Sequence, residues 1–197
     1  MELMILTRRL AVVAALILLV AGPARASVIL TATEVGSDVV FQGGGTFDLT
    51  DLTFYLDSFS SSGIRANFVV VLLGSLPNAP IDYYQGITGP AHIGPGIGIG
   101  INFPTSGSGD KLGLSSNILI VPDGYTSGSP LSATDTFAGQ SFASLGLTPG
   151  TYLYTWGSAP HADSLTIQIG AVPEPSSMML LGTAIVAAAA YRRRRIN

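Results

Sequence analysis

Apolar and polar residues alternate along the middle of the chain, and this period of two predicts β-strands. Aromatic side chains occupy alternate positions from Tyr152 to Trp156, and aliphatic side chains alternate in the same way from Leu165 to Ile169. Such alternation is typical of half-buried strands. Residues 157–162 contain glycine, serine and proline and predict the loop of an antiparallel hairpin. Further strands are expected at Val28–Glu34, Thr46–Leu56, Arg65–Leu73, Gly96–Phe103 and Leu119–Val121, and around Phe137 and Phe142.

Short strands separated by turns rich in glycine, proline and serine predict an all-β fold. The expected architecture is a single antiparallel β-sandwich or jelly-roll-like domain over residues 27–171. No segment of this region shows the 3.6-residue period of an amphipathic helix. The wholly apolar run Phe68–Leu73 is typical of a central strand that is buried on both faces.

Isoleucine and glycine alternate between Ile93 and Phe103, so a strand here would have one apolar face and one bare face. A bare glycine face permits the close approach of another sheet, a loop or a ligand. The alternative is a flexible or bulged edge, which we favour because interior glycine weakens a strand. The spacing matches neither a dinucleotide-binding fingerprint nor a phosphate-binding loop.

The first 26 residues have the three-part pattern of a secretory signal peptide. Two arginines precede the apolar run Leu10–Ala21, whose 12 residues have the length of a signal-peptide helix. An uncleaved N-terminal anchor is the alternative, but the short apolar run and an A-x-A site argue against it. The predicted cleavage site consists of Ala24, Ala26 and, as the first residue of the mature protein, Ser27.

Residues 172–197 combine a rigid acidic motif, an apolar helix and a cationic end. Pro173 and Pro175 hold the backbone around Glu174 extended. A helix over the 16 residues 176–191 would be about 24 Å long, which is short against a hydrocarbon core of about 30 Å. It therefore predicts a marginal transmembrane helix. The positive-inside rule places the arginines that follow it in the cytoplasm, namely Arg192, Arg193, Arg194 and Arg195.

This order of motif, apolar run and arginines resembles the PEP-CTERM sorting signal of exported proteins in Gram-negative bacteria that make exopolysaccharide. Residues 148–156 and 163–170 are similar to small PEP-CTERM surface proteins as well. The resemblance implies processing near Pro173–Pro175 by the membrane enzyme exosortase, after signal peptidase has acted. It implies a precursor anchored in the inner membrane and a product at the cell surface or in the extracellular matrix. A simple C-terminal anchor without processing is the alternative.

Without its two apolar ends, the chain is strongly acidic. Residues 27–171 contain two basic and ten acidic side chains, so their net charge is −8, against −3 for the whole chain. Such a surface disfavours nucleic acid and anionic lipid as partners and is compatible with neutral polysaccharide or divalent cations. The chain contains no cysteine, which excludes a thiolate nucleophile and cysteine-ligated zinc.

Residues that could carry catalysis are few, and we expect neither an enzyme nor a cofactor. His161 and Asp163 permit a Ser-His-Asp arrangement, but no Gly-x-Ser-x-Gly elbow occurs in the chain. A glycosidase needs two carboxylates across a cleft, and sequence cannot place those of Asp48, Asp51 and Asp57 in that way. Their simplest role is solvation of the surface. We expect no metal, although Asp110 could be one ligand of an irregular calcium site.

Aromatic residues offer the clearest candidates for ligand contact. Tyr152, Tyr154 and Trp156 share one face of a strand and could stack on a sugar, although such a face usually packs into the core. A second candidate platform consists of Tyr83, Tyr84 and Tyr125. The expected function is a structural or adhesive role in exopolysaccharide or biofilm. The alternatives are a carbohydrate-binding module and, third, a secreted hydrolase.

Overall fold

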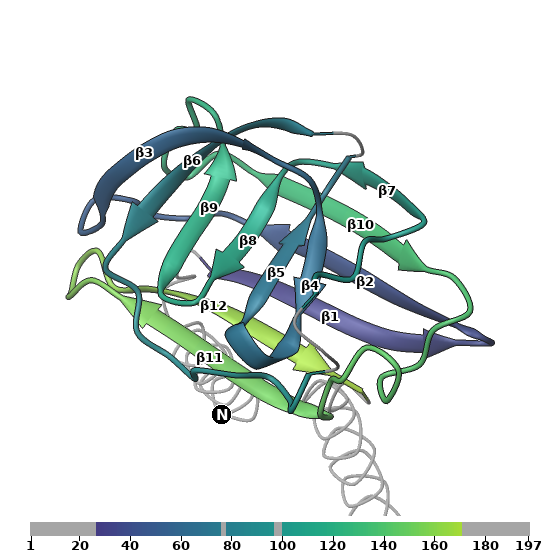
Figure 1. Ribbon diagram of the computed structural model, residues 1–197. Coiled ribbons are helices and arrows are strands. Elements are labelled where there is room, and N and C mark those ends of the chain that lie inside the picture. Colours follow the sequence, from purple (N-terminus) through teal and green to yellow (C-terminus); the bar gives the residue numbers. More distant parts are fainter. Residues whose placement is uncertain (1–26, 76–77, 97–99, 171–197) are drawn as a thin grey trace, which may run out of the picture.

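The computed structural model describes residues 27–75, 78–96 and 100–170, and these form an all-β domain of two sheets (Figure 1). Within these residues the one helical segment is a 3-10 turn, η1 (Ala66–Phe68), and no helix is long and apolar enough to cross a membrane. The predicted signal peptide and C-terminal helix lie outside the described residues. The division of the chain at residues 26 and 171 therefore stays a prediction.

Each sheet has six strands. In spatial order, the first sheet consists of β11 (Gly150–Trp156), β12 (Asp163–Ile169), β1 (Ser27–Val35), β2 (Asp38–Gly45), β10 (Leu131–Phe137) and β7 (Ser106–Gly109). The second sheet consists of β3 (Thr53–Ser60), β6 (Ala79–Gln85), β9 (Ile118–Pro122), β8 (Leu112–Ser115), β5 (Val70–Leu73) and β4 (Gly63–Arg65).

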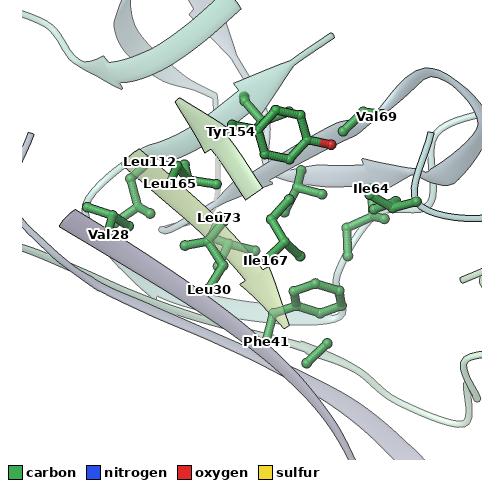
Figure 2. Close-up of a cluster of buried hydrophobic side chains, with 14 of the residues drawn as sticks. Val28, Leu30, Phe41, Ile64, Val69, Leu73, Leu112, Tyr154, Leu165 and Ile167 are labelled. Atoms are coloured by element: carbon green, nitrogen blue, oxygen red, sulfur yellow. The ribbon is translucent and has the colours of Figure 1, made fainter. Parts of the chain in front are cut away.

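The two sheets face each other across one hydrophobic core, as in a sandwich-like fold (Figure 2). Strands of the first sheet contribute buried side chains such as Leu30, Phe41 and Ile167, and those of the second contribute Leu73 and Leu112. The alternation of β12 is borne out, since every second residue from Asp163 to Ile169 is buried. Burial of these apolar faces supplies the main stabilisation of a sandwich-like fold.

The predicted hairpin is confirmed, but its attachment to the rest of the sheet corrects the expected topology. β11 and β12 pair antiparallel from Gly150↔Ile169 to Trp156↔Asp163. β12 then pairs in parallel with β1, so the first sheet is mixed and not purely antiparallel. The pattern within a strand records which face is buried and carries no information about the neighbouring strand, which is why the parallel pair was not foreseen.

The strand predictions at Val28–Glu34, Leu119–Val121 and Phe137 are confirmed by β1, β9 and β10. The prediction at Thr46–Leu56 is largely wrong, because residues 46–52 are not a strand and β3 begins at Thr53. Strands β2, β6, β7 and β8 were not predicted. The prediction at Phe142 is also wrong, since this residue lies in a turn.

The apolar run at Arg65–Leu73 forms two strands and a turn instead of one long strand. The chain reverses between β4 and β5 through η1 and Val69, whose backbone is left-handed with φ of 45°. The strand expected at Gly96–Phe103 is also wrong for its described residues, because Asn102 makes only an isolated bridge to Ile64. Residues 97–99 lie outside the described part of the chain.

Candidate functional site

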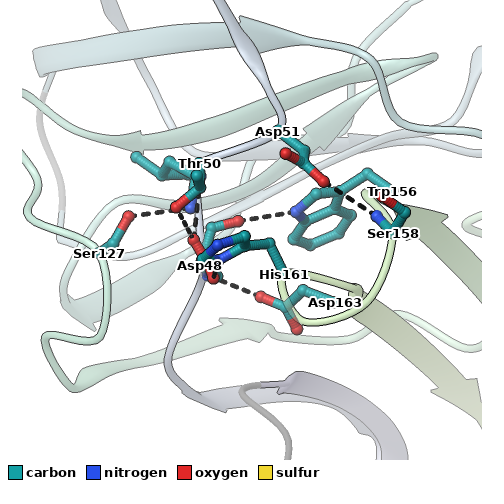
Figure 3. Close-up of polar contacts among 9 residues, drawn as sticks. Asp48, Thr50, Asp51, Ser127, Trp156, Ser158, His161 and Asp163 are labelled. Carbon is teal, nitrogen blue, oxygen red and sulfur yellow. Dashed lines mark hydrogen bonds and ion pairs between the residues drawn. The ribbon is translucent and has the colours of Figure 1, made fainter.

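Two loops that are far apart in the sequence meet around Asp48 (Figure 3). One connects β2 to β3, and the other connects β11 to β12. The carboxylate of Asp48 accepts a hydrogen bond from the Thr50 amide at 2.9 Å and lies 2.9 Å from Nδ1 of His161. The amide of Asp48 donates to Oδ2 of Asp163 at 2.7 Å, and Asp51 accepts the Ser158 amide at 2.9 Å.

The electrostatics of this cluster differ between its two central carboxyl groups. Hydrogen bonds from Thr50, joined by one from His161, lower the pKa of Asp48 to about 2. Burial raises the pKa of Asp163, although the amides of Asp48 and Ser164 oppose this effect. Both oxygens of Asp163 accept backbone amides, at 2.7 and 2.6 Å. These contacts give the carboxylates a structural role in joining the two loops.

The structure thus brings His161, Asp163, Asp48 and Asp51 together, whereas Asp57 lies apart on β3, opposite Asp82. Asp110 accepts the Ser132 amide at 2.9 Å, as aspartates in turns commonly do. Among the residues that the structure describes, no group of three or more His, Asp or Glu side chains could hold a metal ion.

We expect Asp48→Asn to lower the free energy of unfolding by about 1–2 kcal/mol at pH 7, because hydrogen bonds to the charged carboxylate are weakened. The pKa of Asp48 in the folded state, about 2, lies below the ordinary aspartate pKa of 3.8. The stability from ionisation is therefore present above pH 3.8 and is lost as the pH falls towards 2. Urea unfolding of wild type and variant at pH 2 to 7 measures the difference in their free energies of unfolding. A difference that does not become smaller below pH 4 contradicts the prediction.

Tyr152, Tyr154 and Trp156 do share one face of β11, as predicted. The predicted contact with glycan is wrong for Tyr154 and Trp156, because both are buried. Tyr154 is 1% exposed and Trp156 is 4% exposed. The Tyr154 hydroxyl donates to the Pro90 carbonyl at 3.2 Å, and Trp156 Nε1 donates to the Asp48 carbonyl at 2.8 Å. Both rings belong to the core, as large aromatics facing inward from a strand usually do. Tyr152 is only half-buried.

The second candidate platform is wrong as well, because its three tyrosines do not share a surface. Tyr83 packs on Leu72, Ile81 and Ile120, which form a small cluster apart from the main core. Tyr84 and Tyr125 pack against the main core. The hydroxyl of Tyr125 donates to the Ser129 carbonyl at 2.7 Å.

Tyr152 instead lines a groove beside the turn between β4 and β5. The groove consists of two adjoining hollows of about 540 and 450 Å³, which share Asn67 and His92. Tyr152 and Thr148 lie in the first, and Phe68, Ser116 and Asn117 lie in the second. We call this the Asn67 groove. Its walls are aromatic rings, amides and an imidazole, which suit a ligand with both apolar faces and hydroxyl groups.

Backbone hydrogen bonds fix the segment that carries His92. Ile93 is fully buried and donates to the Ala66 carbonyl at 3.0 Å, and its carbonyl accepts the Thr148 amide at 2.9 Å. Gly96 lies against Asn67 so closely that a Cβ atom would come within 2.8 Å of the Asn67 side chain. Gly96 thus makes the kind of close approach that the glycine-rich stretch permits, here to the η1 turn, although a flexible or bulged edge was the favoured interpretation.

Arg65 lines neither hollow, but it contacts two residues that do and so lies at the border of the groove. Its guanidinium carbon lies 4.2 Å from the centroid of the Phe68 ring, and its Nε donates to Oδ1 of Asn67 at 3.2 Å. Such stacking over an aromatic face holds a guanidinium in place. Sequence reasoning identified Tyr152 but missed Arg65, Asn67, Phe68 and His92 as site residues. The one available signal was that Arg65 is one of two basic residues in an acidic domain.

The remaining predicted site residues belong to the two ends of the chain. Ser27 is the first residue of β1, and Ala24 and Ala26 lie outside the described residues. Pro173, Glu174, Pro175 and the four arginines Arg192, Arg193, Arg194 and Arg195 lie outside them too. A family model describes this second region. Residues 171–195 match the model of the PEP-CTERM protein-sorting motif.

The chain carries a PEP-CTERM sorting motif. This motif supports an exported protein that is directed to the cell surface and sorted through exosortase. It covers the C-terminal part of the chain and leaves the β-domain outside the match. The β-domain has no counterpart in the other comparisons, since no curated protein and no solved structure matches the chain.

Proposed function

We propose that this PEP-CTERM protein is a non-enzymatic component of the cell surface or extracellular matrix, with a structural or adhesive role in exopolysaccharide or biofilm. The observation that carries the proposal is the sorting motif at residues 171–195, joined to a β-domain with a continuous core. In this proposal, signal peptidase removes residues 1–26 and the C-terminal helix holds the precursor in the inner membrane of a Gram-negative bacterium. Exosortase then processes the precursor near Pro173–Pro175.

The sorting step is tested by replacing Pro173, Glu174 and Pro175 with alanine in a host that has exosortase. We expect the variant to stay in the membrane fraction at the size of the anchored precursor, because the rigid extended motif that the enzyme would recognise is lost. Immunoblots of membrane, surface and medium fractions measure the outcome. Replacing Ser176 and Ser177 with alanine is the matched control, and this variant should be processed like wild type. Equal size and location of wild type and triple variant would overturn the proposal.

Saccharide binding is the second candidate function, and the Asn67 groove favours it. Tyr152 is the one member of the predicted aromatic face that is not buried, and it lines this groove with polar side chains. A component of an exopolysaccharide matrix that contacts the polysaccharide directly would need such a site. The two proposals are compatible, because the sorting motif and the groove involve different residues.

A further inference from the structure

We propose that the Asn67 groove, with Arg65 at its border, binds a carboxylate-bearing saccharide, that is, an oligomer of uronic acid. This inference deepens the proposed function and rests on it for the presence of polysaccharide around the protein. It differs from the expectation of a neutral glycan, which was based on the net charge of the domain. No carboxylate among the described residues lines the groove, and the charge of Arg65, which contacts two of the lining residues, is opposite in sign to the net charge of the domain.

The first argument is the position of the accessible cation. Arg65 and Lys111 are the only basic residues between positions 27 and 171, and Lys111 is buried. Among the described residues, Arg65 is therefore the only lysine or arginine whose charged group solvent can reach. No carboxylate among the described residues lies within ion-pair distance of it. On a domain with a net charge of −8, an anionic ligand is repelled broadly and attracted at this point.

The second argument is the geometry of the guanidinium. The contacts with Phe68 and with Asn67 Oδ1 use one face of the group and its Nε. The terminal nitrogens are the donors that bind a carboxylate in a bidentate manner. Because stacking limits the motion of the side chain, less entropy is lost when it binds.

The third argument is the lining of the groove beyond the cation. Phe68 is 54% exposed and offers a ring surface in the second hollow, while Tyr152 offers one in the first. His92 and Asn67 border both hollows, and Asn117 borders the second. Aromatic surfaces accept the apolar faces of sugar rings, and amides and imidazole bind hydroxyl groups. Two adjoining hollows of this size suit consecutive sugar units better than a small anion.

Isothermal titration calorimetry on the full chain tests the proposal, in a polyoxyethylene detergent that contains no sugar. The probes are hexamers of galacturonic, mannuronic and guluronic acid, with maltohexaose as the neutral comparison. We expect at least one uronate hexamer to bind about tenfold or more tightly than maltohexaose. Arg65→Gln should weaken that binding by about tenfold, and Arg65→Lys by less, since charge is kept and the planar pair is lost. Raising the salt concentration should weaken it as well.

Matched aromatic variants test the site itself. Phe68→Ala should weaken binding about tenfold, whereas Phe59→Ala should leave it unchanged. Phe59 is 66% exposed on β3 and lies outside both hollows. Equal melting temperatures show that the variants are folded. The proposal is overturned if no uronate hexamer binds, if maltohexaose binds equally well, or if Arg65→Gln binds like wild type.

Failure of this inference can be told from failure of the proposed function. Arg65→Gln leaves the sorting motif unchanged, so it should be exported and processed like wild type. The triple alanine variant at residues 173–175 leaves the groove unchanged, so the purified chain should bind the uronate hexamer with wild-type affinity. Normal sorting of the triple alanine variant, together with uronate binding that depends on Arg65, contradicts the sorting proposal alone. Failed sorting of that variant, together with no uronate binding by the wild type, contradicts the groove alone.

Discussion

Trp156→Ala is expected to lower the free energy of unfolding by about 3–5 kcal/mol, because it removes a large buried ring and leaves a cavity. The ring packs 5.7 Å, centroid to centroid, from Phe47, and Nε1 donates to the Asp48 carbonyl at 2.8 Å. The substitution therefore also leaves that carbonyl without its donor. Since small domains are stable by about 5–15 kcal/mol, this is a large share of the total.

Urea unfolding followed by near-UV circular dichroism measures this loss, with the tyrosines as probes. Leu153→Ala is the matched control on the same strand, because Leu153 is 52% exposed on the opposite face. It should change stability by about 0.5 kcal/mol or less. Trp156→Phe should cost less than alanine, because it keeps most of the ring volume and loses the hydrogen bond. A Trp156→Ala protein with wild-type stability would contradict the assignment of this residue to the core.

The strands at β11 and β12 could be predicted from sequence because each has one face on the core, so burial follows a period of two. β2 escaped prediction for a reason that lies in the packing. Its second half is Gln42–Gly45, which lacks the β-branched residues of a typical strand. A Cβ atom at Gly43 would come within 2.4 Å of the Leu30 side chain on the paired strand β1, so that buried side chain would have to shift to admit one. Sequence shows the glycine but not the side chain that crowds it.

The candidate groove was less predictable than the fold, because its residues come from four separate segments. Asn67 follows β4, His92 lies in the connection after β6, Asn117 lies in the β8–β9 turn and Tyr152 lies on β11. No periodic pattern links these positions. The aromatic face of β11 predicted ligand contact by three residues. Two of them, Tyr154 and Trp156, are buried, and only Tyr152 lines the groove. The buried members are held by polar contacts at their edges, which sequence cannot reveal.

A buried polar network near the edge of the two sheets is the basis of the last prediction. Asp135 on β10 is 0% exposed, and its Oδ1 accepts the Gly74 amide at 3.2 Å. Its Oδ2 has no hydrogen-bond partner among the described residues. Lys111 is also buried and donates to Ser62 Oγ at 2.7 Å, and Ser62 Oγ donates to the Gly74 carbonyl at 2.9 Å. Charge on Asp135 is thus poorly solvated.

Burial raises the pKa of Asp135 to about 6, although the Gly74 amide and the charge of Lys111 oppose the shift. The unfolded carboxyl has a pKa near 3.8. Because the folded state holds its proton more tightly, the free energy of unfolding decreases as the pH rises from 3.8 to 6. The loss is complete above about pH 6 and amounts to about 3 kcal/mol. The sign is opposite to that expected for Asp48, whose contribution is lost only below pH 3.8.

The variant Asp135→Asn isolates the contribution of Asp135 ionisation to the free energy of unfolding from the contributions of all other titratable groups. The amide keeps an oxygen for the Gly74 donor and cannot ionise, so the variant lacks the penalty above pH 6. We expect it to match wild type near pH 4 and to exceed it by up to about 3 kcal/mol at pH 7.5. Urea unfolding of both proteins across this range gives the difference in the free energy of unfolding, from which the contributions of the other titratable groups cancel. A difference that does not change with pH would mean that Asp135 ionises in the fold as easily as in the unfolded chain, and that Lys111 offsets its burial in full.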